Sequence, residues 1–457
     1  MSKAPALKAP ARKPRAQRPH PATQEIDAHE GDPDFMKSLA RGLAVLRSFG
    51  DHRRGLTISQ ASQRTGIPRA AARRCLLTLE KLGYVAADGD SYLPCPKVLS
   101  LGQGFLSSNI LAASAQKDEF ERRMAGKLPA GFSLDAYLQD LAANPQKVAT
   151  RKASEMVLGP INDQIPETIG GSADLTGSNN TKTKAQAPFT ADNYAGRYVY
   201  YGIREFGMAC AMNGMALHGG VIPYGGTFLV FSDYCRAAIR LSALQQLRVV
   251  YVMTHDSIGL GEDGPTHQPV EHMMSLRVMP NLDTYRPCDV IETAECWALA
   301  LEKADGPSLL ALSREGLPQL RTDVSENLSA KGAYRLKAAD AARKVVLIAS
   351  GSEVEIALAT AQKLEEAGFG ADVVSMPSWE RFDAQPETYR DEVLPEGVLL
   401  ASIEAGTTIG WERYVGRKGL RFGLDGFGAS APVKALYDHF GLTADKIAPQ
   451  IIGALSN

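Results

Sequence analysis

The sequence predicts an α/β protein in which an N-terminal winged helix-turn-helix precedes a larger body of parallel sheets. The chain has 457 residues, which is enough for about three domains. Between residues 35 and 95 the order of patterns is helix, helix-turn-helix and hairpin. From residue 151 onward, short apolar runs alternate with helical patterns, as expected for parallel strands buried between helices.

The first 34 residues carry few apolar side chains. They are rich in Ala, Pro, Lys and Arg, and they turn acidic from Glu25 to Asp34. Such a segment cannot bury enough surface to offset its ordering entropy, so we expect a disordered tail and ordered structure from near Phe35. We also expect no secretory signal and no membrane-spanning helix, because the chain has neither a signal-like apolar region nor a long apolar run.

The cysteines and histidines do not have the spacing of metal ligands. Six cysteines occur without a CxxC pair. Four of the eight histidines lie between residues 218 and 272, but their spacing fits no usual zinc motif. We therefore expect a reduced, cytoplasmic protein with no membrane partner and no metal ligands of its own.

Three helices are predicted before residue 83. Segment 35–49 has leucines at helical spacing. Segment 57–66 begins with the capping-box pattern T-x-x-Q and ends at Gly66, which suits the end of a short helix. Pro68 suits the first turn of a third helix that continues to Leu82. This order predicts a helix-turn-helix.

A hairpin and an arginine-rich helix complete the predicted DNA-binding motif. The stretch 88–90 (DGD) lies between two apolar pairs, which predicts a tight turn. The second helix of a helix-turn-helix enters the major groove with its N-terminal side chains at the base edges. The DNA-binding candidates are Arg69, Ala70, Arg73 and Arg74. Ala70 and Ala71 are small enough to let the helix sit deep in the groove. A row of arginines can equally be a solvated helix face.

The net charge of −1 conceals a division along the chain. Residues 1–110 hold 17 basic and 9 acidic side chains, a net charge of +8. Residues 111–457 hold 33 and 42, a net charge of −9. Only six of the 17 basic residues precede Glu25, so the tail explains part of the asymmetry. The division predicts a basic module with an anionic partner, joined to an acidic body.

The body contains three apolar runs that are its strongest strand candidates. They are VVYVMTH (249–255), KVVLIAS (344–350) and GVLLASIE (397–404). Helical patterns lie beside them at 232–248 and 353–367. Residues 111–150 are mainly polar and helical, and we interpret them as a connector.

Segment 35–109 contains the stretches SLARGLAVLRSF, LTISQASQRTGIPRAAARRCLLTLEKLGYV and SYLPCPKVLSLGQGFLSS. These stretches resemble the N-terminal DNA-binding domain of the IclR family of bacterial transcription regulators. The resemblance implies DNA as a partner. It ends near Asn109, so the effector domain of that family has no counterpart in view.

The body contains, in order, the stretches KDEFERRMAGKLPAGF, RKASEMVLGPI, GGSADLTGSN, GIREFGMACAMNG, PYGGTFLVFSDY, THDSIGLGEDGPTHQPVEH, LSREG, ASGSEVEIAL and GFGASAP. They resemble the transketolases, and they follow the order of that family. The resemblance implies a linker at 110–144, a pyrimidine-binding α/β domain of thiamine-diphosphate enzymes at 145–320 and a C-terminal α/β domain at 331–457. It also implies thiamine diphosphate as cofactor and a phosphosugar as substrate.

The transketolase resemblance assigns roles to matched residues. Glu205, in REFGM, matches the carboxyl group that bonds the pyrimidine N1′ and favours the imino tautomer, whose 4′-nitrogen can take the C2 proton. The other cofactor-binding candidates are Phe228, Phe231, Tyr234 and Asp174. The substrate-binding candidates are Arg151, Ser178, His255, Asp263, His267 and Arg314. Glu205, His255 and His267 are the catalytic candidates.

Each of these residue types also has a structural interpretation. The aromatic residues at 228, 231 and 234 are three apart and predict one stripe, which is more often core than cofactor site. A single histidine is usually a satisfied buried side chain, and a single arginine usually forms a surface salt bridge. We interpret His218 and His272 as structural or secondary.

One transketolase signature is missing from the sequence. The GDG motif, which marks the domain that holds the diphosphate through magnesium, does not occur. We therefore expect this chain to supply only the pyrimidine half of the site, as a homodimer or with a partner chain that carries the diphosphate-binding domain. Three functions stay open: half of a transketolase, a DNA-binding regulator whose transketolase-derived body dimerises or senses a sugar phosphate, and a rearranged gene product that does neither.

Overall fold

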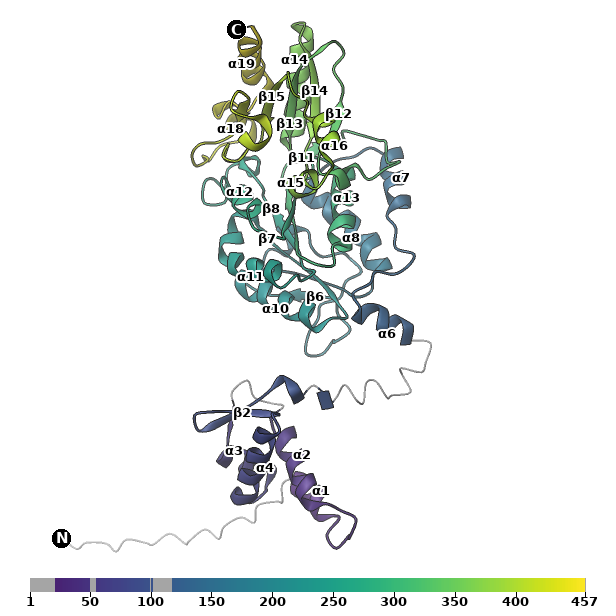
Figure 1. Cartoon of the computed structure of the whole chain (residues 1–457), viewed down its shortest axis with the longest axis vertical. Helices are drawn as coiled ribbons and strands as arrows, with labels where there is room; N and C mark the ends of the chain where they lie inside the picture. Colours follow the sequence, from purple (N-terminus) through teal and green to yellow (C-terminus); the bar gives the residue numbers. More distant parts are fainter. Residues whose placement is uncertain (1–20, 50–54, 99, 102–116, 457) are drawn as a thin grey trace, which may run out of the picture. The chain divides into compact units, whose positions relative to one another are not determined.

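The computed structural model describes residues 21–49, 55–98, 100–101 and 117–456, which fall into two compact units divided after Lys117. The structure confirms the predicted fold class, a winged helix-turn-helix followed by an α/β body (Figure 1). No helix in the described ranges is long and apolar enough to cross a membrane.

The N-terminal unit is a winged helix-turn-helix. Its elements are α1 (Pro21–Asp27), α2 (Lys37–Arg47), β1 (Leu56–Thr57), α3 (Ile58–Thr65), α4 (Arg69–Lys81), β2 (Val85–Asp88), β3 (Ser91–Pro94) and η1 (Pro96–Val98). The capping box is confirmed, because the Thr57 hydroxyl accepts from the Gln60 amide and the Gln60 side chain accepts from the Thr57 amide. Gly66 ends α3 at φ +70°, as predicted. Pro68 is the N-cap of α4 rather than a first-turn residue.

The wing is a small antiparallel sheet in the order β1-β3-β2. The predicted hairpin is confirmed. β2 pairs with β3 in an antiparallel register that places Val85 opposite Pro94 and Asp88 opposite Ser91. β1 was not predicted, because two residues give no alternation that a sequence pattern can reveal.

Helix α1 corrects the prediction that ordered structure begins near Phe35. Ile26 is buried in the core of the unit, and the Thr23 hydroxyl donates to the Thr65 carbonyl at 2.8 Å. One apolar side chain and one hydroxyl hold this turn of chain in place, and average composition does not reveal them. Residues 1–20 of the predicted tail lie outside the described residues.

The second unit begins at Asp118 and contains two helix-covered sheets. The first sheet has the order β6-β5-β7-β8-β10-β9, and all its pairings are parallel. Its strands are β5 (Thr168–Ser172), β6 (Tyr198–Tyr200), β7 (Ile222–Phe228), β8 (Val250–Thr254), β9 (Asp283–Tyr285) and β10 (Ser308–Leu312). The predicted strand at 249–255 is thus β8.

Helices cover both faces of this first sheet (Figure 1). One face packs on α7 (Asp135–Ala143), α8 (Thr150–Gln164) and α13 (Val290–Glu302). The other packs on α10 (Glu205–His218), α11 (Ser232–Leu244) and α12 (His272–Arg277). Short elements connect these: α6 (Lys117–Met124), β4 (Lys147–Ala149), α9 (Thr176–Asn179), η3 (Leu229–Phe231), η4 (Ile258–Leu260), β11 (Gly316–Pro318) and η5 (Leu328–Lys331).

The predicted connector is shorter than expected. Its second half forms α7, whose Leu138 and Leu141 are buried against the core that α8 and α13 share. The two leucines are three apart in an otherwise polar stretch, so the apolar stripe is too narrow to stand out. Residues 111–116 of the connector lie outside the described residues.

The second sheet has the order β12-β14-β13-β15-β16, with β12 antiparallel and the other pairs parallel. Its strands are β12 (Tyr334–Lys337), β13 (Arg343–Ala349), β14 (Gly370–Ser375), β15 (Leu399–Ile403) and β16 (Leu420–Phe422). Its helices are α14 (Glu353–Glu366), α15 (Trp379–Asp383), α16 (Glu387–Val393), α17 (Glu412–Val415), α18 (Val433–His439) and α19 (Ala444–Ser456). The strands predicted at 344–350 and 397–404 are β13 and β15.

Candidate functional site

Most of the predicted site residues lie where the parallel strands of the first sheet end. Phe228 is the last residue of β7, His255 follows β8, and Arg314 comes two residues after β10. Asp174 comes two residues after β5. Open parallel sheets bind ligands at this carboxyl edge, since the connecting loops diverge there. Asp174 and His255 also have positive φ values of 63° and 61°, a strained backbone that is common at functional sites.

The predicted aromatic residues form a cluster with two histidines. The Phe228 ring stacks on His255 at a centroid distance of 3.7 Å and on Phe231 at 5.5 Å. Phe231 in turn contacts Tyr234 at 5.9 Å and His267 at 5.5 Å. The three aromatic residues are not one helical stripe, because they come from β7, η3 and α11 in succession. Tyr234 is 66% exposed, which is unusual for a core residue.

His255 is held in one orientation by a chain of hydrogen bonds. Its Nδ1 lies 2.8 Å from the Thr254 hydroxyl, which accepts from the Asn179 amide group at 2.7 Å. The Ser172 hydroxyl donates to the Asn179 carbonyl oxygen at 2.8 Å. Sequence reasoning missed Asn179 and Thr254, although each is the neighbour of a predicted residue in GGSADLTGSN or THDSIG.

The charge state of His255 follows from its surroundings. Burial, together with the nearby charges of Arg151, Arg314 and His267, lowers the pKa of His255 to about 3. The imidazole is therefore neutral at physiological pH. Since Nδ1 bonds the Thr254 hydroxyl, Nε2 is left to form one hydrogen bond with a polar substrate group, as donor or acceptor according to the tautomer.

Arg151 and Arg314 bring two positive charges to the same region. The Arg151 guanidinium donates to the Ser178 carbonyl at 2.8 Å, and that of Arg314 donates to the Leu260 carbonyl at 2.7 Å. Burial and the charge of Arg314 lower the pKa of Arg151. Both arginines are thus oriented by neutral carbonyl groups. Within the described residues no carboxylate forms an ion pair with either, so their charge is available to an anion.

Glu205 is the first residue of α10 and is 8% exposed. The N-terminus of a helix favours a carboxylate. No donor among the described residues bonds this carboxylate. Burial, followed by the charge of Glu205, raises the pKa of the Cys235 thiol in α11 to about 12. Glu205 is therefore close enough to Cys235 to act on it electrostatically. The carboxyl group is therefore buried, near α11 and free to bond a ligand.

The sequence singled out four other residues, Asp174, Asp263, His218 and His272. Asp263 is exposed on the loop between η4 and α12, and no described residue bonds its carboxylate. Asp174 is exposed as well. His272 lies 3.2 Å from Asp233, and His218 bonds the carbonyl of the next residue. No group of three or more potential metal ligands occurs among the residues that the structure describes.

Five buried charged residues behind the site form what we call the interdomain ion cluster: Asp256, Arg277, Arg286, Glu353 and Glu404. Arg286 pairs with Asp256 at 2.8 Å and with Glu353. Arg277 makes two bonds of 2.7 Å to Glu404. Burial alone would raise the pKa of Glu404, but Arg277 and Arg286 lower it to about 2. The cluster joins the carboxyl edges of both sheets and adjoins the site through Asp256, the neighbour of His255.

The predicted DNA-binding residues lie on the outer face of α4. Arg69, Ala70, Arg73 and Arg74 are exposed, as a groove-reading helix requires. Ala71, in contrast, is 7% exposed and belongs to the core of the unit. It follows that Ala71 cannot help the helix to sit in a groove, because helical geometry turns it inward.

Family models match three parts of the chain. They describe an IclR helix-turn-helix domain at residues 38–89, a transketolase pyrimidine binding domain at 146–319 and a transketolase-like C-terminal domain at 332–443. A transketolase of Sinorhizobium medicae is 55% identical over 351 residues, 76% of this chain and 50% of that protein. The chain spans about half the length of the curated relatives that it matches.

Solved structures give the same likeness. A transketolase from Leishmania mexicana is 39% identical at a TM-score of 0.70, with 85% of this chain and 54% of that chain covered. A second structure, described as a split gene transketolase in an inactive β4 tetramer, is 25% identical at a TM-score of 0.58. It covers 68% of this chain, and 99% of its own length is matched.

Proposed function

Because the chain joins an IclR-type helix-turn-helix domain to the pyrimidine-binding and C-terminal domains of a transketolase, we propose that it supplies one half of a ketol-transfer site. In this proposal it transfers a two-carbon unit between phosphosugars when a partner chain provides the diphosphate-binding domain. The observation that carries the proposal is the cluster of aromatic rings and two histidines at the carboxyl edge of the first sheet, together with the buried Glu205 at the start of α10.

The residues present fit thiamine diphosphate. The buried Glu205 carboxylate has no donor among the described residues and could bond the pyrimidine N1′. Phe228, Phe231 and Tyr234 offer rings for an aminopyrimidine to pack on. Asp174 would lie at the rim of this site. Bound thiamine diphosphate supplies a carbon nucleophile for the transfer.

The chain's own residues would bind and orient the phosphosugar. Arg151 and Arg314, oriented by carbonyl groups, would attract its phosphate, with Ser178 beside Arg151. Neutral His255 would bond a sugar hydroxyl through Nε2, and the hydrogen bond from Nδ1 to Thr254 fixes the ring. His267 and Asp263 lie on the same loop and would contact the sugar as well.

Reconstitution tests this function. The purified chain with thiamine diphosphate, magnesium and xylulose phosphate should show no turnover, and a chain that carries a diphosphate-binding domain should restore it. The inactive assembly of the split gene transketolase supports this expectation. Glu205→Gln should abolish the restored activity, whereas Glu396→Gln, an exposed carboxylate in the C-terminal domain, should not. Full turnover by the chain alone would refute the need for a partner.

The exposed arginines of α4 favour a second function, in which the chain is a DNA-binding regulator. Binding should weaken steeply with salt, since phosphate contacts release counterions. The double change Arg73→Ala/Arg74→Ala should lower affinity for a specific promoter, whereas Arg47→Ala, an exposed arginine of α2, should not. Equal binding to a scrambled duplex would rule out specific regulation.

Both functions fit a cytoplasmic protein. All six cysteines are free, which supports a cytoplasmic location.

A further inference from the structure

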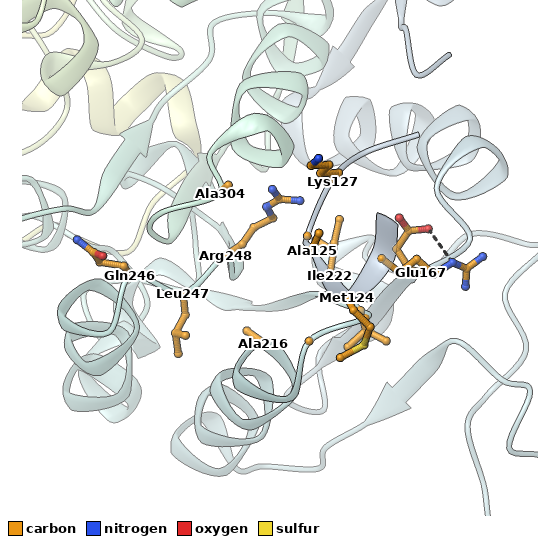
Figure 2. Close-up of a pocket in the computed structure, with 15 residues that line it drawn as sticks. Met124, Ala125, Lys127, Glu167, Ala216, Ile222, Gln246, Leu247, Arg248 and Ala304 are labelled. Atoms are coloured by element: carbon orange, nitrogen blue, oxygen red, sulfur yellow. Dashed lines mark ion pairs between the residues drawn. The ribbon is translucent and has the colours of Figure 1, made fainter. Parts of the chain in front are cut away.

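A charged cavity lies at the edge of the first sheet opposite the candidate functional site. It has a volume of about 210 Å³ and is bordered by the residues that precede β5, β7 and β8. The candidate functional site lies beyond the other ends of these strands. One wall of the cavity is the chain after α6, which contributes Lys127, as Figure 2 shows. The cavity therefore belongs to no part of the proposed ketol-transfer site.

Arg248 is the central cation of this cavity. It lies two residues before β8, and its guanidinium points toward the segment that carries Ala125 and Lys127 (Figure 2). Its Nη1 atom is buried and has no hydrogen-bond partner. Burial lowers the pKa of Arg248 against the opposing effect of Glu167. A buried donor atom of a cation is costly to leave unbonded unless an anion compensates it.

The charge of the Glu167 carboxylate compensates Arg248 only in part. It accepts from the Arg122 guanidinium at 2.7 Å, and Arg123 lies 3.9 Å from its second oxygen. Within the described residues no ion pair joins Glu167 to Arg248. Three lining side chains, Arg123, Lys127 and Arg248, are basic and Glu167 is the acidic one, so the cavity is left with positive charge.

The remaining lining and the size restrict the ligand. Ile222 and Leu247 provide apolar surface next to the cations, which suits a short carbon skeleton. The volume is below the usual range for a drug-sized ligand, about 300 to 1,000 Å³. We propose that this cavity binds a small phosphate-bearing anion, either inorganic phosphate or a short phosphate monoester. The planar fork of Arg248 matches two phosphate oxygens, and Lys127 adds a point charge at the entrance.

A local probe distinguishes this cavity from the arginines of the candidate site. Met124 lines the cavity. The full chain, labelled with ¹³C at its methionine methyl groups, is titrated with sodium phosphate at constant ionic strength, and the Met124 signal is assigned from Met124→Leu. Phosphate bound at Arg151 and Arg314 would move other signals. We expect a saturable shift of the Met124 signal.

Variants test the charges that the proposal invokes. Arg248→Gln should weaken phosphate binding by about ten- to a hundredfold, as an increase in the dissociation constant that the Met124 signal reports. The reason is that a charge-assisted contact is lost. Lys127→Gln, at an exposed position that should not disturb folding, should weaken it less. Arg240→Gln, an exposed arginine of α11, is the matched control and should leave it unchanged.

A Met124 signal that does not move, or that titrates equally in wild type and Arg248→Gln, would overturn the proposal. A second titration with glycerol phosphate identifies the source of the phosphate. Tighter binding of the ester than of inorganic phosphate assigns the site to an organic phosphate, and the reverse order assigns it to free phosphate. Neither result depends on ketol-transfer activity, so the proposal stands or falls separately from the proposed function.

Discussion

Two neighbouring regions of the body use arginine in opposite ways. In the interdomain ion cluster, Arg277 and Arg286 are bonded to buried carboxylates. In the candidate site, Arg151 and Arg314 are bonded to backbone carbonyls only. A carboxylate cancels the charge of an arginine, whereas a carbonyl orients the guanidinium and leaves its charge intact. The contrast indicates that the first pair supports the fold and the second pair awaits an anion.

The regions are also connected through the sequence. His255 of the site precedes Asp256 of the cluster, so the loop after β8 belongs to both. A rigid cluster behind the site would hold His255 in its strained conformation, at φ +61°. Stability and ligand binding should then respond to different arginines, and substitutions can separate them.

The largest effect is expected for Arg286→Met. The change leaves Asp256 and Glu353 as buried carboxylates without their cation, and loss of one partner of a buried ion pair typically costs about 3 to 5 kcal/mol. Urea unfolding of the full chain measures the loss. Arg413→Met, which breaks an exposed pair with Asp383, should cost at most about 1 kcal/mol. Equal losses in the two variants would contradict a supporting role for the cluster.

The second prediction concerns Arg314→Gln. Its affinity for a phosphosugar, measured by calorimetric titration, should fall about ten- to a hundredfold, because a charged contact to phosphate is lost. Its unfolding free energy should change by at most about 1 kcal/mol, since only the bond to the Leu260 carbonyl disappears. Arg240→Gln serves as the control for net charge. If Arg314→Gln destabilised the fold and left phosphosugar affinity unchanged, Arg314 would support the fold and would not bind the anion.

The sequence could predict the strands and the residues at their ends. β8, β13 and β15 are continuous apolar runs, and Glu205, Phe228, His255 and Arg314 lie in stretches long enough to be matched to a family. Local signals were sufficient there, as they were for the capping box of Thr57.

The interactions that brace the site could not be predicted in this way. Arg277 and Glu404 are 127 residues apart, and Arg286 and Glu353 are 67 apart, so no local pattern pairs them. Asn179 reaches Thr254 across 75 residues. The role of Arg248 could not be predicted from the sequence either, because there it is simply a basic residue shortly before a strand. Only the fold shows that its Nη1 atom is buried without a hydrogen-bond partner.

Glu315 lies between the two regions and allows the finest test of the comparison. Both of its carboxylate oxygens are buried without a partner. Burial, followed by the charges of Asp256 and Glu353, raises the pKa of Glu315 from 4.5 to about 7. Below pH 4.5 the group is neutral in the folded and unfolded chain, and well above pH 7 it is ionised in both. Its folded pKa is the higher one, so wild type loses stability as pH rises from about 4.5 to about 7.

Glu315→Gln does not titrate, so its stability relative to wild type should increase across the same pH window. The gain at pH 8 should be about 1 kcal/mol, because the buried amide still lacks partners and offsets part of the relief. Urea unfolding at pH 4.5 and pH 8 measures it, and Glu396→Gln should show no such difference. If the gain were the same at both pH values, Glu315 would titrate alike in the folded and the unfolded chain. At neutral pH the arginines of the candidate site would then lie near an ionised carboxylate, and the distinction between paired and unpaired arginines would weaken.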